Sequence, residues 1–209
     1  MSGGRFISFE GIDGSGKSTQ ARRLAETLRA RGLSVDLTRE PGGSEGAEEI
    51  RRLVLTGDPG RWSAETELLL FTAARRDHME RRILPALARG ETVITDRFAD
   101  STRVYQGTTR GALRDLVDRL HELMIGREPD LTLIFDMDPA AALARTMTPD
   151  RAGSEDRFEG FGLDFQTRLR AGFLEIAAAE PARCRVIDAT GDPGQVAARV
   201  LDALGQVPA

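Results

Sequence analysis

Lysine, cysteine and asparagine are nearly absent from this chain of 209 residues. It has one lysine, Lys17, one cysteine, Cys184, and no asparagine. A lone cysteine cannot form a disulfide within the chain, and the apolar setting of residues 184–187 predicts a buried thiol in a protein of a reducing compartment. The single lysine and the missing asparagine exclude the Asn-Lys-x-Asp motif with which GTPases read guanine.

The chain also lacks an excess of positive charge and a long apolar run. Its 29 basic and 33 acidic residues give a formal charge of −4, and they are interspersed, which argues against a nucleic-acid partner. No stretch approaches the roughly 18 apolar residues of a membrane helix, and no apolar N-terminal segment predicts a signal peptide. We therefore expect a cytoplasmic protein without a membrane partner. A chain of this length buries about 70% of its unfolded surface, so a core needs no disulfides.

The one lysine lies in a phosphate-binding pattern. The pattern G-x-x-x-x-G-K-[ST] is matched by eight consecutive residues, Gly11, Ile12, Asp13, Gly14, Ser15, Gly16, Lys17 and Ser18. A strand-like run, residues 6–9, precedes the loop, and apolar residues at helical spacing follow it. In this context the loop amides and the helix N-terminus face an anion, and Ser18 can bind the accompanying magnesium. The alternative is a glycine-rich turn without a ligand.

The rest of the chain alternates strand-like and helix-like stretches, which predicts an α/β fold with a five-stranded parallel sheet flanked by helices. The expected strands after the first are residues 33–37, 92–95, 131–135 and 186–187. The expected helices are residues 45–55, 63–89 with a kink at Pro85, 113–124, a helix opened by Asp138-Pro139, 163–179, and one opened by Asp192-Pro193. Residues 148–159 show no apolar period and predict a loop.

Charged residues follow the expected strands at their carboxyl ends, where such sheets bind ligands. They are Glu10, Arg39, Glu40, Asp96, Arg97 and Asp136. A carboxylate here can hold magnesium, and an arginine can bind a phosphate in bidentate fashion. For Asp96 and Arg97 the alternative is a mutual ion pair, and for Asp136 it is a structural cap.

The sequence indicates no set of catalytic histidine and nucleophile residues near these strand ends. Neither a Ser-His-Asp nor a Cys-His set is indicated, and the polar neighbours of His78 and His121 predict surface positions for both. The chemistry expected is therefore positioning and charge neutralisation of phosphates.

Several motifs together resemble thymidylate kinase in its bacterial form. They are residues 6–19, Thr38-Arg39-Glu40-Pro41-Gly42-Gly43, Asp96-Arg97-Phe98, Ser-Thr-Arg-Val-Tyr-Gln-Gly from Ser101, and Pro129-Asp130-Leu131-Thr132-Leu133. The resemblance covers nearly the whole chain. It implies a P-loop NTPase three-layer sandwich in one domain spanning residues 1–209, transfer of a phosphoryl group from ATP to dTMP with Mg²⁺, and a homodimer packed through long helices.

The resemblance also implies roles for particular residues. On the ATP side they are the residues of the phosphate loop, from Gly11 to Thr19, and Arg145, which is placed beside the adenine. On the dTMP side, Arg39, Arg51 and Arg97 bind the phosphate, and Asp13 meets the sugar 3′-hydroxyl. The remaining dTMP residues are Phe71 stacked on thymine, Arg75 donating to O4, Thr102 and Gln106 at the base edge, and Tyr105 where a ribose 2′-hydroxyl would lie. The implied magnesium residues are Ser18, Asp13 and Asp96. Phe71 follows three leucines, so without the resemblance it would be assigned to the core.

Residues 148–159 correspond to the family's lid. Some relatives carry an arginine in the phosphate loop, where this chain has Gly14, so Arg151 or Arg157 is expected to supply the catalytic charge together with Lys17 and Arg97. The alternative is a solvated loop, because acidic residues are close by. Two other functions stay open at this point: a P-loop ATPase module without an acceptor, and a kinase of another small acceptor.

Overall fold

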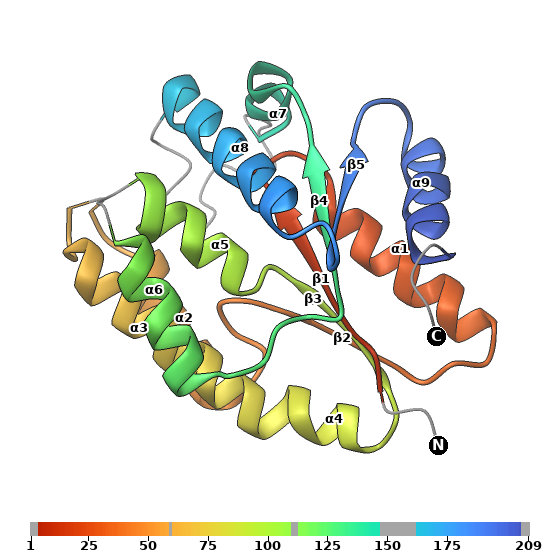
Figure 1. The fold of residues 1–209 in the computed structure, drawn as a ribbon, viewed down its shortest axis with the longest axis horizontal. Helices are drawn as coiled ribbons and strands as arrows, with labels where there is room; N and C mark the ends of the chain where they lie inside the picture. The colour runs from red at the N-terminus through yellow and green to blue at the C-terminus, as the bar shows by residue number, and fades with distance from the viewer. Residues whose placement is uncertain (1–3, 59, 110–112, 147–161, 206–209) are drawn as a thin grey trace.

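A five-stranded parallel sheet forms the centre of the computed structural model, which describes residues 4–58, 60–109, 113–146 and 162–205 (Figure 1). The strands, in the order β2-β3-β1-β4-β5, are Val35–Arg39, Thr92–Asp96, Phe6–Gly11, Leu131–Asp136 and Cys184–Asp188. Phe9 of β1 lies in register with Asp96 of β3 and Leu133 of β4. Every residue of β1 is buried, as expected for the central strand of a parallel sheet. The predicted fold class is confirmed.

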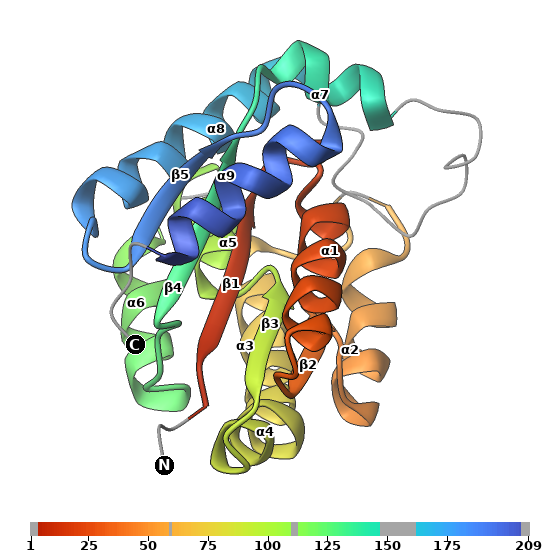
Figure 2. The same cartoon turned by 90° about the vertical axis from the view of Figure 1, so that its right-hand side faces the viewer.

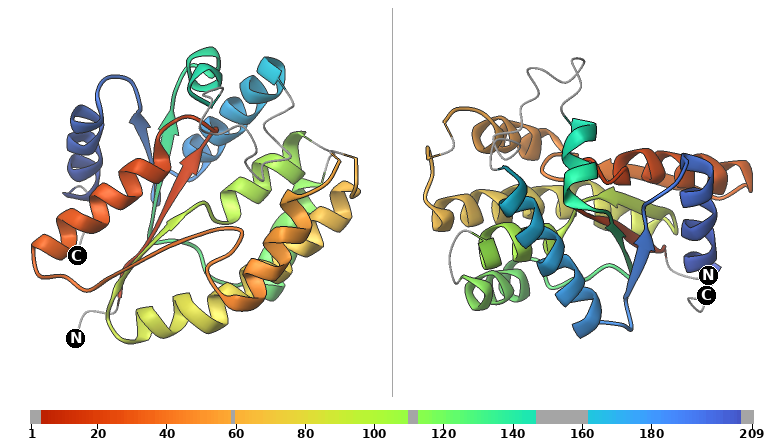
Figure 3. Two further views of the ribbon diagram at one scale, coloured as in Figure 1. Left: turned by 180° about the vertical axis from the view of Figure 1, so that it is seen from behind. Right: turned by 90° about the horizontal axis from the view of Figure 1, so that it is seen from above.

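Helices cover both faces of the sheet (Figures 2 and 3). On one face lie α1 (Lys17–Ala30) and α9 (Pro193–Gly205), which pack on each other. On the other face lie α4 (Leu84–Ala88), α5 (Ala99–Val104) and α8 (Gly162–Ala179). The remaining helices are α2 (Glu45–Leu55), α3 (Ala64–His78), α6 (Arg114–Met124) and α7 (Pro139–Thr146). No helix among the described residues combines the length and apolar character needed to cross a membrane.

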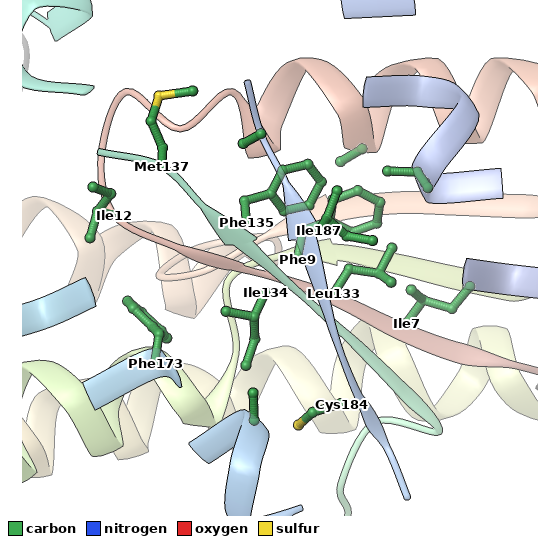
Figure 4. Close-up of a cluster of buried hydrophobic side chains, with 14 of the residues drawn as sticks. Ile7, Phe9, Ile12, Leu133, Ile134, Phe135, Met137, Phe173, Cys184 and Ile187 are labelled. Atoms are coloured by element: carbon green, nitrogen blue, oxygen red, sulfur yellow. The ribbon is translucent and has the colours of Figure 1, made fainter. Parts of the chain in front are cut away.

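Aromatic and branched side chains fill the core between the sheet and its helices (Figure 4). The rings of Phe9 and Phe135 stack with their centroids 5.4 Å apart, while Ile134 and Phe173 lie on the opposite side of β4 in Figure 4. Cys184 is buried and free, as predicted, and burial raises the pKa of its thiol to about 12. This core fixes the relative positions of the strand ends.

The long helix predicted for residues 63–89 is present, but it contains a π-helical turn instead of the kink predicted at Pro85. The Ser63 side chain accepts the Thr66 N–H and caps α3. A π-helical turn, Met79–Ile83, links α3 to α4, and the Leu84 N–H bonds back to the Met79 carbonyl. Pro85 has no N–H to donate, so the change in hydrogen-bond pattern falls just before it.

Helix α5 was not predicted, although its residues carry one of the motifs. All six of its residues are buried, including Asp100 and Arg103, which form an ion pair. A helix buried on all sides has no amphipathic period, so its sequence does not indicate a helix.

Candidate active site

A single cleft at the carboxyl ends of the strands collects the residues that the sequence singled out. It has a volume of about 610 Å³. The predicted residues that line it are Asp13, Gly14, Ser15, Gly16, Lys17, Ser18, Thr19, Arg39, Arg51, Phe71, Arg75, Asp96, Arg97, Thr102, Tyr105, Gln106 and Arg145. Gly11 is the last residue of β1 and Ile12 follows it at the start of the phosphate loop. Arg151 and Arg157 fall outside the described residues.

The phosphate loop passes from β1 into α1 through glycines with positive φ angles. Gly14 has φ +79° and Gly16 has φ +90°, conformations that L side chains rarely adopt. Lys17, the first residue of α1, is 5% exposed. Its Nζ donates to the Ile12 carbonyl at 3.2 Å and to Asp13 Oδ1 at 3.3 Å. The lysine therefore contacts its own loop, on the wall of the cleft where a phosphate would be bound.

Gly14 also allows a close approach between the loop and α7. A Cβ built on Gly14 would lie 2.1 Å from the carbonyl oxygen of Ala142. Any side chain at this position would force α7 away from the loop. An arginine at this position has no room in this chain.

Asp13 lies between two cations and a phenol. Its carboxylate accepts hydrogen bonds from Lys17, from Arg97 and, at 3.0 Å, from the Tyr105 hydroxyl. Burial acts to raise the pKa of Asp13, but Arg97 and Lys17 outweigh it and hold that pKa well below its ordinary value. Asp13 is therefore ionised and holds together the cationic side chains of the loop and of Arg97, the residue after β3.

Arg97 occupies an unusual backbone conformation, with φ 71°, which is rare for a residue other than glycine. Its guanidinium donates to the Gly11 carbonyl at 3.2 Å and to Ser101 Oγ at 2.8 Å. Ser101 in turn donates to Glu10, which also accepts the Phe98 N–H. Arg97 pairs with Asp13 of the phosphate loop rather than with the adjacent Asp96.

Two further arginines lie on the other wall. Arg51 of α2 donates to the Pro41 carbonyl at 2.8 Å, and Arg39, which is exposed, donates to Glu48 at 3.1 Å. Together with Lys17 and Arg97 they make the cleft strongly cationic, so it is suited to two phosphate-bearing ligands.

A flat, partly apolar recess lies beside these arginines. Phe71 of α3 is partly buried, packs against the core and lines the cleft. Arg75, one turn further, donates to Glu40 at 2.7 Å and to Thr102 Oγ1 at 3.0 Å. The Gln106 amide reaches Glu67 at 3.3 Å. The recess combines an aromatic face with fixed donors, which suits a nucleobase.

The residues present also fit a magnesium ion. Asp96 Oδ1 is buried and has no hydrogen-bond partner among the described residues, and Ser18 presents a hydroxyl at the start of α1. The described part of the chain has no cluster of three or more His, Cys, Asp or Glu residues that could hold a metal. Magnesium commonly takes one or two protein oxygens, with waters and nucleotide phosphates completing its shell. Asp13 is less suited, because its oxygens already accept from Lys17, Arg97 and Tyr105.

Glu10, Asp136, His78 and His121 do not line the cleft. Asp136 is held by Arg170 of α8 through two hydrogen bonds of 2.6 and 3.0 Å, so its contact is a structural ion pair rather than the cap named as the alternative. The surface positions predicted for the histidines are wrong: His78 is fully buried and His121 is 8% exposed. Both face carboxylates, Glu40 and Glu128, that are distant in the sequence. Polar sequence neighbours could not indicate those partners.

Some cleft residues were not predicted as site residues. Glu40 was considered only as one of the strand-end carboxylates that can hold magnesium, and Gln20, Ala189, Gly191 and Pro193 were not considered as site residues. The last three follow β5 and line the cleft beside the phosphate loop. The rule that directs attention to the carboxyl ends of strands indicates them as well.

The phosphate loop after the central strand and the cationic cleft beside it define a nucleotide-binding protein of the P-loop class. The family model described as Thymidylate kinase matches residues 9–200. A thymidylate kinase of Dinoroseobacter shibae is 71% identical over 198 residues, covering 95% of each chain, and one of Ruegeria pomeroyi is 68% identical over 203 residues, covering 97% of this chain and 95% of that one. The crystal structure of thymidylate kinase from Ehrlichia chaffeensis superposes with a TM-score of 0.79 at 39% identity, covering 98% of this chain and 99% of that one. The chain belongs to the thymidylate kinase family.

Proposed function

We propose that this protein transfers the γ-phosphoryl group of ATP to dTMP, giving ADP and dTDP for dTTP synthesis. The observation that carries the proposal is the meeting in one cleft of a phosphate loop, an aromatic face with a neighbouring arginine, Phe71 and Arg75, and three further arginines for the acceptor phosphate. The names of the relatives point the same way.

The chemistry suits this set of side chains. The phosphate of a nucleoside monophosphate has a second pKa of ~6, so it is already anionic at neutral pH and needs no general base. The enzyme has to neutralise two phosphates that repel each other and align them. Lys17 binds the transferred group's oxygens, while Arg39, Arg51 and Arg97 bind the acceptor phosphate. Arg145 at the end of α7 lies beside the adenine.

On the acceptor side, Phe71 stacks on thymine and Arg75 donates to its O4, with Thr102 and Gln106 completing the base edge. Tyr105, whose hydroxyl is held by Asp13, excludes a ribose 2′-hydroxyl by occupying its place. Asp13 also accepts the sugar 3′-hydroxyl. Each of these assignments is supported by the side chain's place on the cleft wall.

Magnesium would be held by Ser18 and Asp96, directly or through water, with Asp13 nearby. When bound, it neutralises charge on the phosphate oxygens. Segment 148–159 is the proposed lid. Because Gly14 has no side chain, Arg151 or Arg157 of the lid supplies the guanidinium that neutralises charge on the transferred phosphoryl group. The whole chain, residues 1–209, is proposed to act as one kinase domain.

A homodimer and a cytoplasmic location belong to the same proposal. Helix α6 exposes Leu116, Leu123 and Met124, and α3 exposes Leu69. An apolar surface on long helices is suited to self-association.

The test is an acceptor panel with ATP as donor. Initial rates of ADP formation are measured with dTMP, dUMP, dCMP, dGMP and AMP. We expect dTMP to give the highest kcat/KM. ADP formation that does not depend on any acceptor would indicate an ATPase module, and preference for another nucleotide would indicate a different kinase.

A further inference from the structure

We propose that His78 is a positioning residue for base selection: it fixes the Arg75 guanidinium through the Glu40 carboxylate. The inference rests on the proposed function and deepens it, because His78 itself does not line the cleft. Three contacts from α3 to β2 and the loop that follows it carry the argument.

The Glu40 carboxylate links the two side chains. Arg75 Nε donates to Glu40 Oε2 at 2.7 Å, and His78 Nδ1 lies 3.1 Å from Glu40 Oε1. Arg75 and His78 are three residues apart on α3, so both face the same carboxylate. Because each oxygen has its own partner, the carboxylate cannot rotate to bind Arg75 with both oxygens without losing the histidine.

The imidazole is held from its other side as well. His78 Nε2 lies 2.7 Å from Thr38 Oγ1, near the end of β2. The ring also fills the space beside Gly43, where a Cβ would lie 2.3 Å from Nε2. The ring is fully buried. It therefore connects the end of β2 and the 39–43 loop to α3, the helix that carries Phe71 and Arg75.

The orientation of Arg75 depends on few contacts. Besides Glu40, its Nη2 donates to Thr102 Oγ1 at 3.0 Å, and its guanidinium carbon lies 5.0 Å from the centre of the Phe98 ring. Arg75 is 5% exposed and borders the cleft. A guanidinium has donors only, so in this orientation it favours a base carbonyl over an amino group.

Loss of the donor at Nδ1 leaves Glu40 free to turn in a buried site. The carboxylate would keep its ion pair with Arg75 and change its angle, which moves the remaining guanidinium donors away from the base edge. Discrimination between thymine and cytosine should then fall, while the phosphate contacts persist. KM for dTMP should rise more than kcat falls.

Two substitutions separate the ring nitrogens. In His78→Asn the amide nitrogen can take the place of Nδ1 and donate to Glu40. In His78→Gln the longer amide takes the place of Nε2 and leaves Glu40 Oε1 without a donor, while Arg75 still donates to Oε2. We expect His78→Asn to keep the ratio of kcat/KM for dTMP over dCMP within about threefold of wild type, and His78→Gln to lower it at least about tenfold.

A further variant tests the proposal independently in case the histidine variants do not fold. Thr38→Val removes the hydroxyl partner of Nε2 and preserves the side-chain shape, and it should lower the same ratio by about threefold. Arg75→Ala marks the ratio of an enzyme without the guanidinium. Melting temperatures and ATP affinity are measured for every variant, because a purely structural role would lower stability and leave the ratio unchanged.

His121 provides the matched control. It is a second buried histidine facing a carboxylate, with Nε2 3.0 Å from Glu128 Oε1, and it does not border the cleft. His121→Asn and His121→Gln should leave the dTMP over dCMP ratio at the wild-type value, whatever they do to stability.

Each outcome has a defined meaning. A low ratio in His78→Gln with recovery in His78→Asn supports the proposal. A wild-type ratio in both His78→Gln and Thr38→Val overturns it, as does an equal loss in His78→Asn and His78→Gln. If the wild-type enzyme itself does not phosphorylate dTMP, the proposed function fails, and the wild-type measurement alone identifies that case.

Discussion

Asp13 shows how single residues prepare the cleft for phosphates. Its carboxylate holds Lys17 and Arg97, which come from different elements, at one point of the cleft wall. Burial and the nearby Arg97 lower the pKa of Lys17, while Asp13 acts to raise it. A bound phosphate would compete with Asp13 for the same two cations. The cations are thus positioned before the ligand arrives, which reduces the cost of ordering them.

Lys17→Ala should abolish turnover and leave the fold intact. Among the described residues, Nζ donates only to Ile12 and Asp13 of its own loop, so its loss removes a phosphate ligand and little packing. We expect kcat to fall at least about a hundredfold, with a near-normal circular dichroism spectrum. Activity above a tenth of wild type would rule out the nucleotide-site assignment.

At the scale of elements, the site depends on how closely the phosphate loop and α7 approach one another. The backbone of Gly14 lies so close to the backbone of α7 that no side chain fits between them. Arg145 lies in the last turn of the same helix and borders the cleft. The position of α7 is therefore coupled to the shape of the phosphate loop.

Gly14→Ala is expected to weaken ATP binding. The new Cβ would meet the Ala142 carbonyl, and φ +79° is unfavourable for alanine. We expect the KM for ATP to rise at least about tenfold. Gly32→Ala is the matched control, since Gly32 has φ +82° with no atom near its Cβ position. If the two variants had equal ATP KM values, the contact with α7 would be irrelevant to the loop.

The lid proposal makes a separate kinetic prediction. Arg151→Ala or Arg157→Ala should lower kcat at least about a hundredfold and change the dissociation constants of ATP and dTMP little, because the contact forms in the transition state. Arg168→Ala, at an exposed position of α8, is the control. Steady-state kinetics and ligand titrations of both variants and the double mutant decide it. Normal kcat values in all three would contradict the lid proposal and leave Arg97 and Arg39 as the candidates for the catalytic charge.

The sequence predicts the elements well where apolar residues recur on one face. The helix predicted for residues 45–55 matches α2, and the five strands lie within a few residues of their predicted positions. Helix α5 and the two histidines escape prediction for one reason: their polar residues are buried against partners far away in the chain, such as Glu40 for His78. The site residues could be named from strand ends and motifs, but the contacts among Asp13, Arg97 and Tyr105 could not.

At the scale of the whole molecule, a buried carboxyl links the central strand to α5. Glu10 accepts hydrogen bonds from the Phe98 N–H and the Ser101 hydroxyl. Burial and the neighbouring Asp100 raise the pKa of Glu10 from 4.5 to about 8, against the effect of Arg97. The folded protein therefore retains a proton that the unfolded chain releases at much lower pH.

This difference predicts how stability depends on pH. Between the unfolded pKa of 4.5 and the folded pKa of about 8, the native state binds more protons, so the free energy of unfolding falls as pH rises through that window. Glu10→Gln cannot titrate and should flatten this part of the curve. Urea unfolding at a series of pH values measures it, with Glu26→Gln on the exposed side of α1 as the control. An unchanged slope in Glu10→Gln would contradict the assignment.

The central claim is that one cleft passes a phosphoryl group between two nucleotides. Incubation of the enzyme with γ-³²P-labelled ATP, magnesium and dTMP, followed by separation of the products, tests it most directly. The account predicts that the label moves to dTDP in proportion to the ADP formed. Label released as inorganic phosphate, or label that stays in ATP, would contradict it.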